Sequence, residues 1–173
     1  AWMIAAGFTV ALTRVFFCIS IVSGRSMEPT LQNRDLVVLQ RVAANGYGDI
    51  VACKDRQGEL LIKRVIGLEG DVIQIDGPNG VVYRNGQPLD EPYIVADSYY
   101  TGDEEGPITV EELRFVLGDN RPNSADSRRD YVGQIREKDV KGELLFRLGN
   151  LSGLEKDIRR LQFKARRMFS GQF

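Results

Sequence analysis

The chain has 173 residues, of which 43% are hydrophobic and 27% charged, and its formal net charge is −1. This length fits one domain, or one domain with a smaller lobe, and the apolar content is sufficient for a buried core. No basic stripe interleaved with aromatic residues runs through the central part, so we expect no nucleic-acid partner. Histidine is absent, which excludes Ser-His-Asp and Cys-His catalysis.

The first 22 residues are apolar apart from Arg14 and a few small polar residues. A membrane-spanning helix needs about 20 apolar residues, and Ala1–Thr13 supplies 13 before Arg14 interrupts the run. We interpret residues 1–18 as the end of a transmembrane anchor whose beginning has been removed. The core of a secretory signal peptide is the alternative, but no clear small-residue cleavage site follows.

Residues 19–149 alternate between short apolar runs and turns rich in Gly, Asn and Asp. This pattern predicts a mostly β fold of coiled antiparallel sheets. An acidic stretch rich in Tyr, residues 90–107, is predicted to be a loop. The predicted strands are Leu36–Leu39, Asp49–Lys54, the stretch around Lys63, Val72–Ile75, Val81–Tyr83, Phe115–Leu117 and Lys141–Leu148.

Residues 150–173 are predicted to form a basic amphipathic C-terminal helix. From Leu151 to Phe173 there are six basic and two acidic residues, a net charge of +4. A surface helix packed on the core and an interfacial helix attracted to anionic lipid both remain open. The apolar stripe at helical spacing consists of Leu154, Ile158, Leu161, Ala165 and Met168.

The chain has two cysteines, Cys18 near the expected membrane anchor and Cys53 in a predicted strand of the core. Because these places differ, we expect two free thiols rather than a disulfide. This cysteine use is compatible with an exported domain but does not require one.

A polar turn, Ser23–Leu31, separates the apolar start from the β-rich body. Gly24 permits a tight bend and Pro29 prevents a helix from continuing, so the Ser26 hydroxyl is expected to be accessible. A serine needs a base to act as a nucleophile near neutral pH. Without histidine, the remaining bases are Lys, Asp, Glu and Tyr.

Lys63 is the candidate base because branched and apolar residues flank it on both sides. Alternation along a strand places Lys63 on the same face as Leu61 and Val65, and Arg64 on a face that we expect to reach solvent. Burial would lower the pKa of Lys63, so that its amine can accept the Ser26 proton. A lysine that guards an exposed sheet edge is the alternative interpretation.

A third stretch, Gly118–Arg128, follows the strand-like Phe115–Leu117 and is dense in Asn, Asp, Ser and Arg. By composition alone it is a loop that satisfies its own backbone groups. The spacing of its acidic residues lacks the EF-hand pattern, and we expect no metal or cofactor.

Together these stretches resemble type I signal peptidases, the membrane-bound Ser-Lys proteases that remove signal peptides from exported proteins. Ser26–Leu31 is similar to the nucleophile box of the family, Lys63–Asp71 to its general-base box, and Gly118–Arg128 to its third box. Gly48–Val51 is similar to a fourth, structural box. The resemblance covers roughly residues 14–149, and three ordered boxes in one chain are far more specific than one alone.

The resemblance implies an acyl-enzyme mechanism in which Ser26 is the nucleophile and Lys63 the general base. In the family, the position matching Ser124 hydrogen-bonds the lysine amine, and the positions matching Asp126 and Arg128 pair with each other. Two further residues of the third box, Asp119 and Asn120, are expected only to shape the loop.

The oxyanion hole would use the backbone N–H of Ser26. Some family members add a hydroxyl two residues earlier, where this chain has Gly24, a pattern that resembles the Gram-positive branch. By resemblance, Val22, Leu31 and Ile62 line a shallow apolar groove that accepts small substrate residues, as in Ala-x-Ala. The family also implies a smaller lobe at about residues 72–114 within the catalytic domain, residues 19–149.

The expected partners are signal peptides of secreted preproteins and the lipid bilayer. The expected location is the plasma membrane, with a single span and the catalytic domain on the extracytoplasmic side. Three alternatives are a self-cleaving SOS repressor with a Ser-Lys dyad, a membrane-tethered peptide-binding module and a structural β-domain. The apolar start argues against the first, and intact Ser26, Lys63 and Ser124 argue against the second.

Overall fold

The computed structural model describes residues 16–41, 46–95, 105–111, 114–153 and 155–156. Over these residues the chain is mostly β-strand, arranged in two antiparallel sheets. The strands are β1 Phe17–Ile21, β2 Asp35–Gln40, β3 Ile50–Lys54, β4 Leu60–Leu68, β5 Val72–Asp76, β6 Val81–Arg84, β7 Gln87–Pro88, β8 Glu105–Thr109, β9 Arg114–Leu117 and β10 Val140–Asn150. This part also contains two short 3-10 helices, η2 Arg121–Asn123 and η3 Glu137–Asp139.

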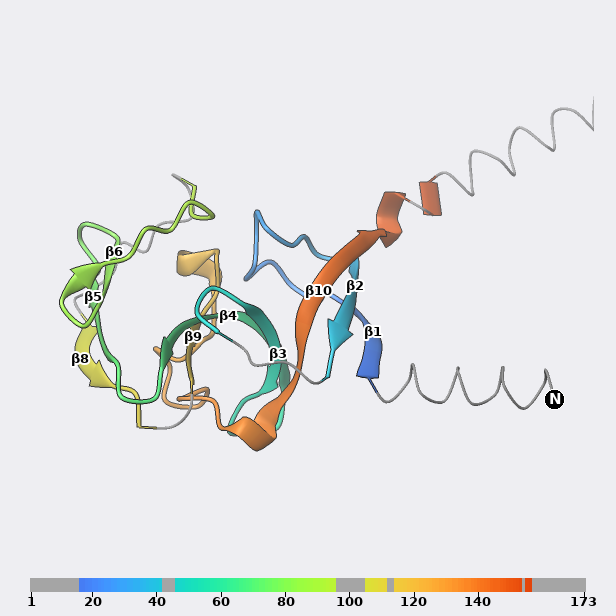
Figure 1. Cartoon of the computed structure of the whole chain (residues 1–173). Helices are drawn as coiled ribbons and strands as arrows, with labels where there is room; N and C mark the ends of the chain where they lie inside the picture. The colour runs from blue at the N-terminus through green and yellow to red at the C-terminus, as the bar shows by residue number, and fades with distance from the viewer. Residues whose placement is uncertain (1–15, 42–45, 96–104, 112–113, 154, 157–173) are drawn as a thin grey trace, which may run out of the picture.

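The larger sheet has the strand order β1-β2-β10-β3-β4-β9. Strand β10, which is 11 residues long, pairs with β3 near its start and with β2 over the rest, so it joins the two halves of the sheet (Figure 1). Register shifts at Leu144/Phe146 and Arg147/Gly149 mark bulges, which bend the strand and allow this long connection.

Strand β4 lies between β3 and β9 and is covered on both faces. Val65 belongs to a cluster with Val51 and Val116 of the neighbouring strands, whereas Ile66 belongs to a cluster with residues of the smaller sheet. The segment from Lys63 to Gly67 is therefore continuously buried. A polar side chain in this segment must find a partner inside the protein.

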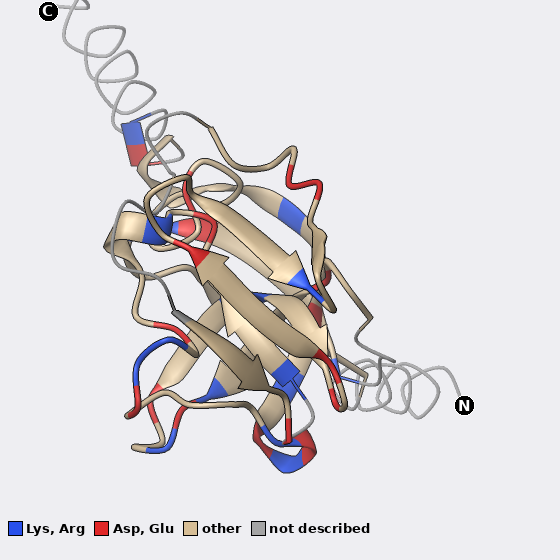
Figure 2. Ribbon diagram, turned by 90° about the vertical axis from the view of Figure 1, so that its left-hand side faces the viewer, with Lys and Arg blue, Asp and Glu red and all other residues tan. Residues whose placement is uncertain are grey.

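The smaller sheet has the order β7-β6-β5-β8. Ile73, Ile75 and Val82 on its inner face pack against Phe115 and Leu117 of β9. The smaller sheet is thus attached to the strand that leads into the loop Gly118–Arg128. Figure 2 views the molecule from this side, and charges of both signs lie mainly in the turns and at strand ends.

The prediction of a mostly β protein with antiparallel sheets is confirmed. The short strands β7 and β8 were not predicted, and β8 begins inside the stretch that was expected to be a loop. Gly106 and Pro107 give β8 a poor strand sequence, so it forms because β5 offers a pairing edge. Cys18 and Cys53 are both free thiols, as expected.

The predicted anchor, residues 1–18, lies outside the described residues except for its last three. Of these, Phe17 and Cys18 belong to strand β1 because they pair with Gln40 and Leu39 of β2. Of the predicted helix at residues 150–173, positions 151–153 and 155–156 are helical, and the rest lies outside the described residues. In the part of the chain that the structure describes, no helix has the length and hydropathy needed to cross a bilayer.

Candidate active site

Ser26 lies in the turn between β1 and β2. Gly24 adopts a φ of +91°, which favours glycine, and its N–H donates a hydrogen bond to Asn33 Oδ1 at 3.0 Å. Met27 and Leu31 are 1% and 2% exposed, and their side chains anchor the turn in the core. The serine is thus presented from a turn that is fixed on both sides.

Lys63 is the fourth residue of β4 and is only 3% exposed. Its Nζ donates hydrogen bonds to Ser26 Oγ at 2.7 Å and to the Ile62 carbonyl oxygen at 2.9 Å. Val51 of β3 is its partner across the ladder, and both residues lie on a covered face of the sheet. The fold therefore brings together a hydroxyl and an amine that are 37 residues apart in the sequence.

Burial lowers the pKa of Lys63 below its usual value of about 10.4, because a protonated amine would lose its hydration there. The charges of Asp126 and Asp119 act in the opposite direction. Burial also raises the pKa of Cys53 to about 12, so this neighbour is an uncharged thiol near neutral pH. Each of the two carboxylates forms an ion pair with an arginine, which compensates its negative charge.

The loop Gly118–Arg128 lies directly against the Ser26 turn. The Asn120 backbone N–H donates to the Ser26 carbonyl oxygen at 3.0 Å, and Asn120 Nδ2 donates to the Arg25 carbonyl oxygen at 3.2 Å. Asn120 was expected only to shape its own loop. It also holds the two peptide groups that flank Ser26, the one before it and the one after it.

A buried ion pair connects the three stretches identified in the sequence. Arg64 Nε and Nη2 donate to the two carboxylate oxygens of Asp119 at 2.8 and 2.6 Å, and Thr30 Oγ1 donates to Asp119 Oδ2 at 2.5 Å. Arg64 Nη1 also donates to the Gly48 carbonyl oxygen at 2.7 Å. The expectation that Arg64 faces solvent is wrong, since the residue is 9% exposed and a carboxylate compensates its charge.

Asp126 and Arg128 form a second ion pair. Arg128 Nε and Nη2 donate to the two oxygens of Asp126 at 2.7 and 2.9 Å. Asp126 Oδ2 accepts a further bond from the Gly118 N–H at 3.0 Å, and Arg128 Nη2 donates to the Arg121 carbonyl oxygen at 2.8 Å. These bonds fix the loop in its fold and engage the Asp126 carboxylate.

Ser124 is buried, but its Oγ has no hydrogen-bond partner among the described residues. The bond to Lys63 that the resemblance implied is therefore not formed, because the lysine amine bonds Ser26 and Ile62 instead. Ser124 lies against Gly118, where an added β-carbon would approach Ser124 Oγ to 2.2 Å and the Ser26 carbonyl oxygen to 2.5 Å. Only glycine at position 118 permits this close packing.

The three predicted groove residues, Val22, Leu31 and Ile62, come together in one apolar cluster with Met27. Val22 and Leu31 are 4% and 2% exposed, so they belong to the core, whereas Ile62 is half-buried. The cluster adjoins the dyad in sequence, because Met27 follows Ser26 and Ile62 precedes the lysine. A role in substrate binding stays a prediction.

Sequence reasoning missed the connection of Arg64 and Thr30 through Asp119. One signal was present, since Arg64 is followed by Val65 and Ile66 in a strand predicted to be largely buried. A buried guanidinium requires a carboxylate, and the polar third stretch contains one. The sequence did not indicate which acidic residue of that stretch would supply it.

The comparison with protein families identifies the chain. Residues 1–148 match the family described as signal peptidase, peptidase S26. The chain belongs to this family. It is therefore a serine peptidase, a hydrolase that acts on peptide bonds.

Curated relatives agree with this assignment. Signal peptidase I of Bacillus amyloliquefaciens is 35% identical over 158 residues, which cover 84% of this chain and 83% of that protein. Signal peptidase I P of Bacillus subtilis subsp. natto is 40% identical over 154 residues, covering 79% and 81%. Among solved structures, a signal peptidase I from Enterococcus faecalis V583 has a TM-score of 0.48 and 31% identity, and covers 60% of this chain and 98% of that one.

Replacing Lys63 with Met tests whether burial disfavours the charged amine. Between the lowered pKa of the folded state and about 10.4, the unfolded chain binds a proton that the folded chain does not, so folding stability rises with pH. K63M removes this slope. We therefore expect the free energy of unfolding of K63M, minus that of the unsubstituted protein, to decrease by about 1.4 kcal/mol for each pH unit within that window.

The measurement is urea unfolding of both proteins between pH 6 and 10. Leu61→Met, on the same face of β4, is the matched control and should show no pH-dependent difference. A difference between K63M and the unsubstituted protein that stays constant over the whole range would contradict a lowered pKa.

Proposed function

We propose that this chain removes N-terminal signal peptides from exported preproteins, with Ser26 as nucleophile and Lys63 as general base. The observation that carries the proposal is the 2.7 Å hydrogen bond between Lys63 Nζ and Ser26 Oγ, in a member of the signal peptidase family. The absence of histidine supports it further, because lysine is the neighbouring group that can take the serine proton.

In the proposed reaction, neutral Lys63 accepts the Ser26 proton while Oγ attacks the carbonyl carbon of the scissile peptide bond. The resulting ammonium returns the proton to the leaving amine as the intermediate collapses to an acyl-enzyme. Lys63 then takes a proton from the water that attacks the ester, and it returns this proton to Ser26 Oγ as the second intermediate collapses, which restores the neutral dyad. The two proton-accepting steps require an uncharged amine, which agrees with the lowered pKa of Lys63.

The proposed oxyanion donor is the backbone N–H of Ser26. The carbonyl oxygen of the same peptide group belongs to Arg25 and accepts a hydrogen bond from Asn120 Nδ2 at 3.2 Å. Because a peptide group is planar, this bond also fixes the direction of the Ser26 N–H. Gly24 offers no side-chain donor, so stabilisation of the oxyanion depends more strongly on the fixed direction of this N–H.

We further propose that the apolar cluster of Val22, Leu31 and Ile62 forms the floor of the substrate groove. Two of its members are almost fully buried, so an approaching side chain meets a filled core and finds little depth. A methyl group fits such a surface, and a longer side chain does not. An extended substrate presents alternate side chains to one surface, which accounts for small residues at the first and third positions before the cut.

The proposal includes attachment to a membrane, with the apolar residues before strand β1 as the end of an anchor, the residues from β1 to 149 as catalytic domain with a lobe at about 72–114, and 150–173 as a basic tail. We place the catalytic domain on the extracytoplasmic side of the plasma membrane.

An exposed apolar face on β1 supports attachment to a membrane. Phe17, Ile19 and Ile21 alternate along β1 and are 38%, 66% and 53% exposed. Val38 pairs with both Ile19 and Phe146, and Phe146 is 48% exposed, so the apolar face continues onto β10. This face begins directly after the apolar run and suits a lipid surface.

Substituting either member of the dyad should abolish cleavage. We expect Ser26→Ala and Lys63→Ala each to lower kcat/KM by at least about a thousandfold, because neither the nucleophile nor its base has a substitute. The measurement is cleavage of a labelled preprotein, with circular dichroism to show that each variant is folded. Lys54→Ala, at an exposed lysine on the neighbouring strand, should cleave normally, and full activity in either dyad variant would refute the mechanism.

The shallow groove predicts a preference for alanine before the cut. We expect a peptide with Ala at the first and third positions to be cleaved at least about a hundredfold faster, by kcat/KM, than one with Leu at the first position. Opening the floor by Leu31→Ala should narrow this ratio. Equal cleavage of both peptides by the unsubstituted protein would show that these residues do not form the groove.

The exposed face of β1 predicts lipid binding that does not depend on the anchor. In a protein lacking residues 1–15, Ile19→Asp should weaken binding to vesicles of phosphatidylcholine and phosphatidylglycerol by about tenfold. The reason is that the Ile19 side chain would be buried between β1 and the lipid surface in the bound state. Leu60→Asp is the matched control, as Leu60 is 54% exposed at the start of β4. Equal loss in both variants, or no loss in Ile19→Asp, would argue against this face.

A further inference from the structure

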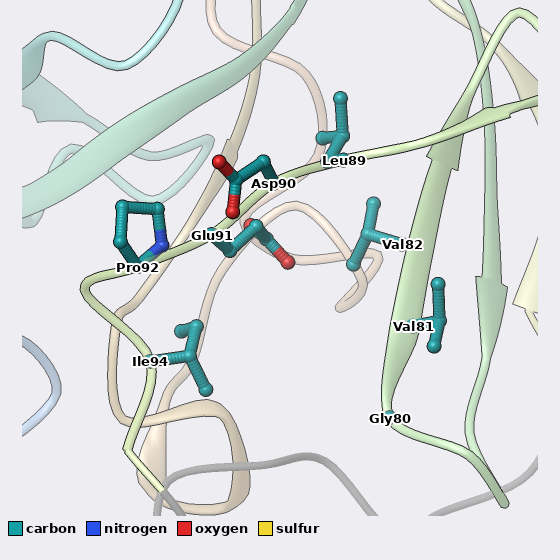
Figure 3. A pocket seen from close by; sticks show the side chains of 8 residues that line it. All are labelled: Gly80, Val81, Val82, Leu89, Asp90, Glu91, Pro92 and Ile94. Atoms are coloured by element: carbon teal, nitrogen blue, oxygen red, sulfur yellow. The ribbon is translucent and has the colours of Figure 1, made fainter.

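A short segment of the smaller lobe, residues 89–94, reaches both the loop Gly118–Arg128 and strand β4. Leu89 packs on the core of the smaller sheet and Ile94 is 7% exposed, so the segment is attached near both of its ends. Between them, Glu91 lines a cavity of about 320 Å³ that separates the segment from β6 (Figure 3). The other contacts of Glu91 reach towards the active site.

Glu91 binds Arg121 of the third stretch through both carboxylate oxygens. Arg121 Nη1 donates to Glu91 Oε2 at 3.1 Å, and Nη2 bonds the other oxygen. The two side chains are 3% and 9% exposed, so this is a buried ion pair. Arg121 Nε also donates to the Gly118 carbonyl oxygen at 3.1 Å, which ties the start of the loop to the same guanidinium.

Tyr93 connects Glu91 to the arginine of strand β4. Its hydroxyl donates to Glu91 Oε1 at 2.6 Å, and the Arg64 guanidinium lies over its ring, 3.8 Å from Cζ to the ring centroid. Arg64 in turn binds Asp119 with two hydrogen bonds. Glu91 therefore links two buried arginines, Arg121 by direct hydrogen bonds and Arg64 through the ring of Tyr93.

We propose that Glu91 and Tyr93 are positioning residues for the active site, an inference that rests on the proposed function. They act through Arg64 and Arg121, each of which is the sequence neighbour of a residue that shapes the dyad. Arg64 directly follows Lys63 in β4.

Arg121, for its part, directly follows Asn120, whose backbone N–H donates a hydrogen bond to the Ser26 carbonyl oxygen. Glu91 thus sets the distance between the strand that carries the lysine and the loop that holds the serine. A displacement of about 1 Å in such an arrangement costs up to a hundredfold in rate, even when the cause lies outside the reacting groups. This gives the smaller lobe a catalytic consequence although it supplies no reacting group.

The test is steady-state cleavage of a peptide with an Ala-x-Ala site by the full chain and by Glu91→Gln. Glutamine keeps the size of the side chain but removes the charge that Arg121 requires. We expect kcat to fall about tenfold with KM changed less than about twofold, because Glu91 acts through Arg121 and Tyr93 on the geometry of the dyad. The acid limb of the pH profile should also move to higher pH, as a less enclosed Lys63 regains water and its pKa rises.

Asp90→Asn is the matched control, since it makes the same chemical change at an exposed neighbour, and it should leave kcat and the pH profile unchanged. If Glu91→Gln does not fold, Tyr93→Phe decides, because it keeps the ring over Arg64 and removes only the hydroxyl; we expect its kcat to fall about threefold.

A purely structural role would lower the melting temperature and leave kcat and the pH profile of the folded protein intact, and that result would overturn the inference. Failure of the unsubstituted protein to cleave the peptide would instead refute the proposed function. The two failures are therefore distinguishable.

Discussion

The proposed chemistry depends on one constraint, which is that Lys63 must be able to lose its proton beside Ser26 although two carboxylates lie nearby. Burial of Lys63 supplies the driving force, because a protonated amine is poorly solvated at a 3% exposed position. The same burial strengthens any attraction to a carboxylate, and Asp126 and Asp119 both act on the lysine. The negative charges of these two acids must therefore be compensated by other groups than Lys63.

Two arginines satisfy this constraint. Arg64 binds both oxygens of Asp119, and Arg128 binds both oxygens of Asp126, so each carboxylate has a cationic partner of its own. Buried ion pairs of this kind add little net stability, but breaking one costs about 3–5 kcal/mol and leaves a charge without a partner. Their value here lies in the geometry that they impose on the backbone around Ser26. The loop can approach the serine turn closely only because Gly118 has no side chain.

The strands were predictable where alternation and turn residues agree, as at β3, β5 and β6. Strand β8 was not, because its sequence is poor for a strand and its existence depends on a partner 30 or more positions away. Likewise, alternation correctly separated Lys63 from Arg64 but gave no information on what covers the second face. Asp119 and the ring of Tyr93 cover Arg64 on that face, so it is buried.

The site was predictable to the extent that local motifs define it. Ser26 and Lys63 stand out because the chain has no histidine and because their flanking residues resemble the family boxes. The contacts that hold them do not, since Arg64–Asp119 spans 55 positions and Arg121–Glu91 spans 30. No spacing rule relates such pairs, and only the tertiary fold decides which acid meets which arginine. Ser124 shows the converse, because a role carried over by resemblance did not specify the rotamer or the partner of its hydroxyl.

The central claim is that Lys63 is the uncharged base of this active site. It is tested most directly by NMR titration of protein labelled with ¹³C at the lysine ε-carbon, in which the Lys63 signal is assigned by its loss in Lys63→Met. We expect a Lys63 pKa well below the usual value of about 10.4, equal to the midpoint of the acid limb in the pH dependence of kcat/KM. A Lys63 pKa at or above about 10.4, or a rate midpoint that does not coincide with it, would show that Lys63 is not the base.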